Sequence, residues 1–189
     1  MKKWLFSLLI ALGGCAVVPP SGVTPITGFE LDRYLGQWYE IARLDHSFER
    51  GLSQVSAHYS RRDDGGVAVL NRGYNDRAGV WKEAEGRAYF TGEPTVGSLK
   101  VSFFGPFYGG YHIIALDREN YSYAMISGPS RDYLWILART RQLPAAVLGD
   151  LLRQARALGF AADSLIWVKQ DRDAASPPDR APRPADIRN

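Results

Sequence analysis

The chain has 189 residues, of which 46% are hydrophobic, and a formal net charge of +3. This length and apolar content suffice for one domain with a substantial core but are too small for two comfortable domains. The arginines are scattered and no basic run is interleaved with aromatic residues, so we expect no nucleic-acid partner. The single cysteine, Cys15, excludes an intramolecular disulfide, so the core alone must hold the fold together.

The amino terminus has the pattern of a leader that is removed. Two lysines precede an apolar run at residues 4–12, which is too short to span a bilayer as a helix. The Gly-Gly-Cys15 ending of this run resembles a bacterial lipobox, in which the cysteine becomes the acylated first residue of the mature protein. We therefore predict a lipoprotein signal peptide over residues 1–14 and lipidation of Cys15; the alternative is an ordinary signal peptide with a chance cysteine. Ala16 stands where an aspartate would favour the inner membrane, so we expect anchoring in the outer membrane.

The segments on either side of the predicted domain are poor in core-forming residues. Residues 15–28 begin with a Pro/Gly/Ser-rich spacer of the kind that tethers a domain to a membrane. Residues 172–189 hold four prolines and no aromatic residue, so they cannot bury enough apolar area to offset the entropy lost on ordering. We therefore predict an acylated tether, a folded domain over residues 29–171 and a disordered tail.

The folded domain begins with a clear strand pattern. Residues 36–43 read GQWYEIAR, in which large apolar and polar side chains alternate after a glycine, as in a strand with two different faces. Similar runs recur along the chain and are bounded by turn residues such as the DDGG of residues 63–66. We predict strands at residues 38–43, 55–60, 67–74, 81–90, 98–104, 110–116, 121–127 and 133–139.

Eight antiparallel strands joined to their nearest neighbours by short loops close into an up-and-down barrel, which leaves no free edge. A sandwich would need long crossovers, which the sequence lacks. A helix is predicted between Pro144 and Gly159, residue types that suit a first helical turn and a left-handed C-terminus. The fold class is therefore an all-β, eight-stranded antiparallel barrel with one C-terminal helix packed outside. The helix should cover the barrel with Val147, Leu148, Leu151, Leu152, Ala155 and Leu158, and residues 164–169 could return alongside the sheet.

Three widely spaced signatures accompany these elements: Gly36 with Trp38, the turn from Asp117 to Tyr121, and Arg139 in the last strand. With stretches such as GQWYEIARLDHSFERG and KVSFFGPFYGGYHIIALDRENY, they make the chain resemble the bacterial outer-membrane lipocalins, close to the apolipoprotein D branch of that family, over residues 28–171. The resemblance implies a barrel that holds a lipophilic small molecule and does not act as a catalyst. The tail after about residue 171 departs from the family pattern.

The resemblance also implies roles for individual residues. Trp38 is expected to lie across the closed end with Arg139 packed over its ring, a structural cation–π closure rather than a ligand site. Because side chains alternate along a strand, inward Trp38 and Arg139 imply that Glu40, Ala42, Tyr133, Trp135 and Leu137 also face inward. Carried over to the other strands, the family register predicts a further inward set: Ala57, Tyr59, Val69, Asn71, Val101, Phe103, Tyr111, Ile113, Ala124 and Ile126.

The predicted lining is mostly apolar and aromatic. We expect Ala57, Tyr59, Val69, Asn71, Val101, Phe103, Tyr111, Ile113, Trp135 and Leu137 to contact a fatty acid or a lysophospholipid, with its polar head at the mouth near Phe48, Phe107 and Tyr108. An eight-stranded barrel has room either for one small ligand or only for its own side chains, so a structural envelope lipoprotein with a packed barrel is an alternative. The aromatic loop at residues 103–108 could instead touch the membrane or pair two copies of the chain.

The sequence offers little for catalysis. It has no Gly-x-Ser-x-Gly elbow and no Cys/His spacing typical of zinc sites, so we expect no metal and no cofactor. We expect His58 and His112 to face outward and His46 to lie in the first loop, all three solvated. Glu40 is the one carboxylate placed inside, where it needs a partner. It is either hydrogen-bonded structure or an acid acting on a ligand, and an enzyme acting on a lipid is the weaker alternative.

Overall fold

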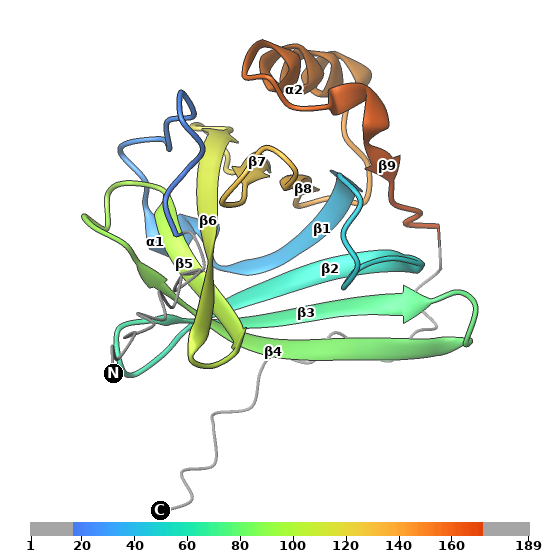
Figure 1. Ribbon diagram of the computed structural model, residues 1–189, viewed down its shortest axis with the longest axis horizontal. Helices are drawn as coiled ribbons and strands as arrows, with labels where there is room; N and C mark the ends of the chain where they lie inside the picture. Colours follow the sequence, from blue (N-terminus) through green and yellow to red (C-terminus); the bar gives the residue numbers. More distant parts are fainter. Residues whose placement is uncertain (1–16, 172–189) are drawn as a thin grey trace, which may run out of the picture.

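The computed structural model describes residues 17–171; the leader, Cys15 and the tail after residue 171 lie outside this range. Within it, eight strands form a closed antiparallel barrel, because the first strand pairs with both the second and the eighth (Figure 1). The strands are β1 (Gly36–Arg43), β2 (Leu52–Arg61), β3 (Val67–Asn75), β4 (Val80–Phe90), β5 (Ser98–Phe104), β6 (Phe107–Leu116), β7 (Tyr123–Ser127) and β8 (Leu134–Ala138). All eight predicted strands are present, and most of their ends differ by one to three residues from the expectation.

The chain outside the barrel strands also follows the sequence pattern. A single turn of helix, α1 (Leu31–Tyr34), precedes β1, and the predicted helix forms as α2 (Ala145–Ala157). A 3₁₀ turn, η1 (Ala162–Ser164), leads to β9 (Ile166–Trp167), which pairs with the end of β1 and so confirms the predicted return to the sheet. Among residues 17–171, no helix is long and apolar enough to cross a membrane.

The molecule has two apolar clusters, one on each face of the barrel wall. The first fills the interior around Trp38, Tyr59 and Ile113. The second lies between the outer face of β1, β6, β7 and β8 and the apolar side of α2, with Leu151 and Ala155 at its centre. In Figure 1, α2 lies outside the barrel on the side of β7 and β8. Burying the helix face against the barrel wall therefore confirms the predicted packing.

A β-bulge in β1 changes which of its side chains face inward. In the pairing with β8, Glu40 lies opposite Leu137 but Ala42 lies opposite Ile136, so one extra residue is accommodated between them. Ala42 was predicted to face the interior; it instead packs in the outer cluster under α2. Because alternation resumes one residue later, Arg43 lies opposite Trp135 and is buried.

The closed end of the barrel matches the expectation. The Arg139 guanidinium carbon lies 4.0 Å from the centre of the Trp38 ring, and the Trp38 indole donates to the Tyr34 carbonyl at 2.8 Å. Arg139 also donates to the backbone carbonyls of Arg33 and Gln37, at 2.7 and 2.8 Å. These contacts pack Arg139 over Trp38 and join both residues to α1 and the start of β1.

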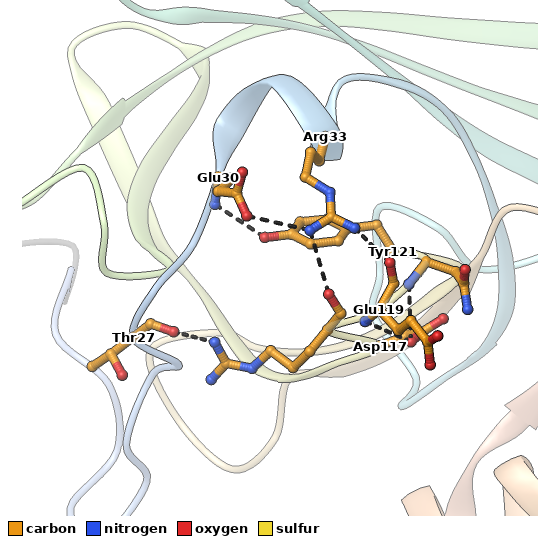
Figure 2. Close-up of polar contacts among 8 residues, drawn as sticks. Thr27, Glu30, Arg33, Asp117, Glu119 and Tyr121 are labelled. Atoms are coloured by element: carbon orange, nitrogen blue, oxygen red, sulfur yellow. Dashed lines mark hydrogen bonds and ion pairs between the residues drawn. The ribbon is translucent and has the colours of Figure 1, made fainter.

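The N-terminal segment is fastened to the β6–β7 turn at the same end, as Figure 2 shows. Arg33 donates to the Glu119 carbonyl at 2.6 Å and lies over the Tyr121 ring, 4.1 Å from its centre. The Tyr121 hydroxyl accepts from the Glu30 backbone N–H at 3.1 Å, and Arg118 donates to the Thr27 carbonyl. The β6–β7 turn, which was predicted as a family signature, therefore fixes the N-terminal segment in place at the closed end of the barrel.

Candidate ligand site inside the barrel

The predicted lining residues all lie on the interior face. Strand register places Ala57 opposite Trp38 and Asn71 opposite Ala57, and residues directly opposite one another share a face of the sheet. All ten predicted lining residues except Asn71 pack in the interior cluster with Trp38: Ala57, Tyr59, Val69, Val101, Phe103, Tyr111, Ile113, Trp135 and Leu137. The interior wall is therefore largely apolar, as the alternation pattern predicted.

Burial is uneven along the interior. Trp38, Ile113 and Ala124 have no exposed surface, whereas Val101, Tyr111 and Trp135 are only partly buried although they face inward. Part of the interior wall therefore keeps accessible surface, around Tyr111 and toward the end of the barrel opposite Trp38. That end is formed by the β1–β2, β3–β4, β5–β6 and β7–β8 loops, and we call it the mouth.

Three tyrosine hydroxyls meet near the closed end. Tyr111 lies within hydrogen-bond distance of both Tyr34 and Tyr59, at 2.7 and 3.0 Å. Burial raises the pKa of Tyr59 to about 12 and raises the pKa of the other two phenols as well. The trio is therefore a neutral hydrogen-bonded group in an otherwise apolar wall.

A charged cluster lies on the interior wall nearer the mouth. The Arg43 guanidinium donates to Glu40 at 2.6 Å and to the Glu49 backbone carbonyl at 2.8 Å. The Glu49 carboxylate in turn accepts from the Trp135 indole at 3.0 Å. All three charged side chains are buried, so the carboxylate that was predicted to need a partner has one.

The two carboxyl groups of this cluster hold protons more tightly than usual. Burial, followed by the charge of Glu49, raises the pKa of Glu40 well above its ordinary value, and burial also raises the pKa of Glu49. The Arg43 charge opposes the shift of both groups without cancelling it.

His46 was predicted to be solvated, and this prediction is wrong. Its ring is stacked 5.3 Å from Phe48 and 4.8 Å from Tyr133, and it is tilted against Trp135 at 4.8 Å. Burial, and secondly the charge of Arg43, lower the pKa of His46 to about 4, so the ring is neutral at pH 7. A loop histidine thus becomes part of the wall at the mouth.

His112 also differs from the expectation, whereas His58 remains partly exposed. His112 faces outward from β6, as predicted, but it has no exposed surface, because Ser98 lies 3.0 Å away and the main chain of Val18 packs against it. A side chain that points outward from the barrel is still buried when another segment of the chain covers that face of the sheet. In residues 17–171 no group of His, Cys, Asp and Glu side chains has the arrangement of a metal site.

Sequence reasoning missed Arg43, His46 and Glu49 as interior residues. Arg43 is brought inside only by the bulge, and the two others come from the irregular β1–β2 loop, where no period reveals orientation. An arginine three residues beyond the inward Glu40, with a further glutamate in the next loop, was the available signal of a buried charge cluster.

Comparison with known proteins agrees with this architecture. The chain matches the family described as Lipocalin-like domain over residues 29–170. It is 56% identical over 161 residues to the Outer membrane lipoprotein Blc of Vibrio cholerae, covering 85% of this chain and 94% of that one. It is 59% identical over 152 residues to the protein of the same name from Escherichia coli K12, covering 80% and 85%.

The fold is shared with much more distant proteins. Insecticyanin from the tobacco hornworm superposes with a TM-score of 0.64 at 23% identity, over 79% of this chain and 85% of that one. The similarity to the two bacterial lipoproteins supports the predicted location of this chain, which is lipid-anchored at the outer membrane. Because the family model matches most of its length and two relatives share more than half of their aligned residues with it, the chain belongs to the lipocalin family.

Proposed function

We propose that this lipocalin holds one fatty acid or one lysophospholipid inside its barrel and serves to store or move it at the outer membrane. The observation that carries this proposal is the apolar interior wall that is sealed at Trp38 and remains partly accessible near Val101, Tyr111 and Trp135. An acyl chain of about sixteen carbons gains roughly 13 kcal/mol gross from burial, at ~0.8 kcal/mol per CH₂. The costs of ordering and association remove much of this, leaving room for micromolar or tighter binding.

The interior favours binding over catalysis. The carboxyl pair of Glu40 and Glu49 is neutralised by Arg43, and no nucleophilic serine or cysteine of the described residues is hydrogen-bonded to it. We therefore propose a carrier rather than an enzyme. A structural lipoprotein with a closed, filled barrel is the competing function.

Identification of the native cargo tests the proposal. Organic extracts of the purified protein should contain fatty acids or lysophospholipids by mass spectrometry, and added palmitate should displace a neutral fluorescent probe such as N-phenyl-1-naphthylamine. Leu137→Arg, which puts a charge in the interior wall, should abolish displacement with a moderate loss of stability. An empty extract together with no displacement from the wild type would favour the structural lipoprotein.

We also propose that the mouth faces the membrane. Its loops carry the most exposed large apolar side chains of residues 17–171: Phe104 at 82%, Phe107 at 67% and Phe48 at 65%. The Ser21 carbonyl accepts from Arg131 in the β7–β8 loop at 2.6 Å, so the N-terminal segment passes this end of the barrel. Cys15 is six residues earlier in the sequence, and six residues span at most about 20 Å, so an acyl anchor on Cys15 is compatible with a mouth that contacts the membrane.

The orientation can be tested with the mature chain carrying Cys15→Ser, so that the anchor does not dominate. Sedimentation with vesicles of phosphatidylethanolamine and phosphatidylglycerol should fall several-fold on Phe104→Ser with Phe107→Ser. Trp167→Ser, which removes a half-exposed aromatic ring from β9 and leaves the β5–β6 hairpin intact, is the control and should change little. If the double variant instead separates paired chains in sedimentation velocity while vesicle binding is unchanged, the hairpin joins two copies of the chain.

A further inference from the structure

Two buried nitrogen atoms near the mouth have no hydrogen-bond partner among the described residues. They are Nε of Arg43 and Nε2 of His46, whose residues are only 2% and 4% exposed. A buried polar nitrogen without a partner costs roughly 1–3 kcal/mol, so native proteins keep such atoms mainly where water, an ion or a ligand satisfies them.

The two atoms belong to one place in the barrel wall. Arg43 lies opposite Trp135 in the β1–β8 pairing, and the His46 ring centre is 4.8 Å from that of Trp135. Arg43 and His46 are also close enough for the Arg43 charge to influence the His46 ring. Both side chains therefore converge on Trp135, one of the interior residues that solvent still reaches.

The other contacts of Arg43 leave its Nε without an acceptor. Three of the five N–H groups of the guanidinium, all on the two terminal nitrogens, donate to Glu40 and to the carbonyls of Glu49 and Leu52. A neutral His46 can donate from Nε2 in one of its two tautomers. The wall beside Trp135 therefore has two N–H donors without an acceptor, one on each of these side chains.

The charge balance decides what kind of acceptor fits. The Arg43 guanidinium pairs with Glu40, and burial raises the pKa of both carboxyl groups and so favours their neutral forms. If a carboxyl group takes up a proton when an anionic group arrives, the Arg43 charge is left to pair with the anion. An ammonium group, by contrast, would bring a second cation beside Arg43.

We propose that Arg43 and His46 form the subsite for the acidic head of the bound lipid, a carboxylate or phosphate oxygen that accepts from both N–H groups. The acyl chain then runs from Trp135 toward the closed end, along Ile113 and Leu137. This subsite rests on the proposed lipid-binding function and specifies which end of the ligand is recognised. It also predicts uptake of a proton by the Glu40–Glu49 pair when an acidic lipid binds.

Matched ligands test the subsite directly. Palmitate and 1-hexadecanol have the same sixteen-carbon chain, and each can compete with N-phenyl-1-naphthylamine for the wild-type protein at pH 7. We expect palmitate to bind at least tenfold more tightly than hexadecanol, the size of one charge-assisted hydrogen bond. Lysophosphatidic acid, which presents a phosphate, should share the preference.

Two variants then locate the preference. His46→Phe keeps a stacked ring without the nitrogen, and Arg43→Lys keeps the charge without Nε. Each should lower palmitate affinity about tenfold while leaving hexadecanol affinity unchanged. His58→Phe, which changes a histidine on the outer face, is the matched control and should behave as the wild type. Circular dichroism identifies a variant that fails to fold, in which case the other variant decides.

Three outcomes overturn the subsite. Equal affinities of palmitate and hexadecanol for the wild type would show that no acidic head is recognised, while lipid binding itself stands. A preference that survives in both variants would place the head elsewhere in the barrel. Competition between palmitate and millimolar inorganic phosphate or acetate would assign the two nitrogens to free anions instead of a lipid. If neither lipid displaces the probe, the carrier function itself fails along with the subsite.

Discussion

Each end of the barrel sets an arginine against a tryptophan, but the two pairs are satisfied to different degrees. At the closed end, Nε and both terminal nitrogens of Arg139 donate to backbone carbonyls, and the guanidinium lies over the Trp38 ring. Near the mouth, Arg43 lies across from Trp135 between two carboxyl groups, and its Nε has no acceptor in the described chain. The same residue types therefore form a cluster in which every arginine nitrogen is hydrogen-bonded at one end, and a cluster in which one arginine nitrogen lacks an acceptor at the other.

The largest difference between the ends should appear in stability. Trp38→Ala removes a fully buried indole and its bond to the Tyr34 carbonyl, and should lower the free energy of unfolding by about 3–5 kcal/mol. Urea denaturation followed by far-UV circular dichroism measures this loss. A loss below about 1 kcal/mol would mean that the closed end is not the structural closure inferred here.

Conservative exchange of the two arginines sharpens the comparison. Arg139→Lys loses a planar donor that serves three carbonyls, and should cost about 1–2 kcal/mol of stability without changing the ratio of palmitate to hexadecanol affinity. Arg43→Lys should change that ratio, as described above. If Arg139→Lys also altered the ratio, the closed end would take part in head-group recognition.

The smallest expected effect concerns pH. A carboxyl group whose pKa is raised in the folded protein contributes stability at low pH, and this contribution is lost as pH rises through the raised pKa. Glu40 faces Arg43 on β1 and Glu49 from the first loop, with Trp135 on β8 and Tyr59 on β2 nearby. Glu40→Gln, which cannot ionise, should therefore gain stability relative to the wild type as pH rises from 5 to 8.

Parallel urea titrations of the two proteins across this range measure the gain. His46, whose pKa is lowered, affects stability below pH 6.5 in both proteins and cancels in the difference. Asp45 and Arg50, an exposed ion pair in the same loop, are also common to both. A constant difference between pH 5 and 8 would show that Glu40 is ionised throughout and that the carboxyl pair holds no extra proton.

The regular part of this fold could be predicted because it depends on periodicity. Alternation gave the strands, turn residues gave their ends, and the i, i+3, i+4 spacing of Leu148, Leu151 and Leu152 gave the helix and its buried face. Trp38 and Arg139 were assigned by family resemblance, and the Arg139 guanidinium lies 4.0 Å from the centre of the Trp38 ring. Alternation from these two residues gave the interior residues of the first and last strands, and the family register gave those of the other strands.

The polar part of the site could not be predicted in the same way. Whether Arg43 faces in or out depends on a bulge that is defined only by the pairing of β1 with β8. Glu49 and His46 come from a loop, where orientation depends on contacts with Arg43 and Trp135 rather than on any repeat. The burial of His112 depends on the N-terminal segment that crosses β6, and no local pattern reveals such a crossing.

The extra residue in β1 lets one short strand serve two unrelated surfaces. Before it, Trp38 and Glu40 belong to the cavity side; after it, Ala42 belongs to the helix side and Arg43 returns to the cavity. If the same residues paired with β8 without the bulge, simple alternation would turn Ala42 inward and the Arg43 guanidinium outward beneath α2, where its charge would lie among aliphatic side chains. Deleting Ile41 would remove the bulge yet leave Arg43 opposite Trp135, so the length of β1 as well as its composition decides where this charge lies.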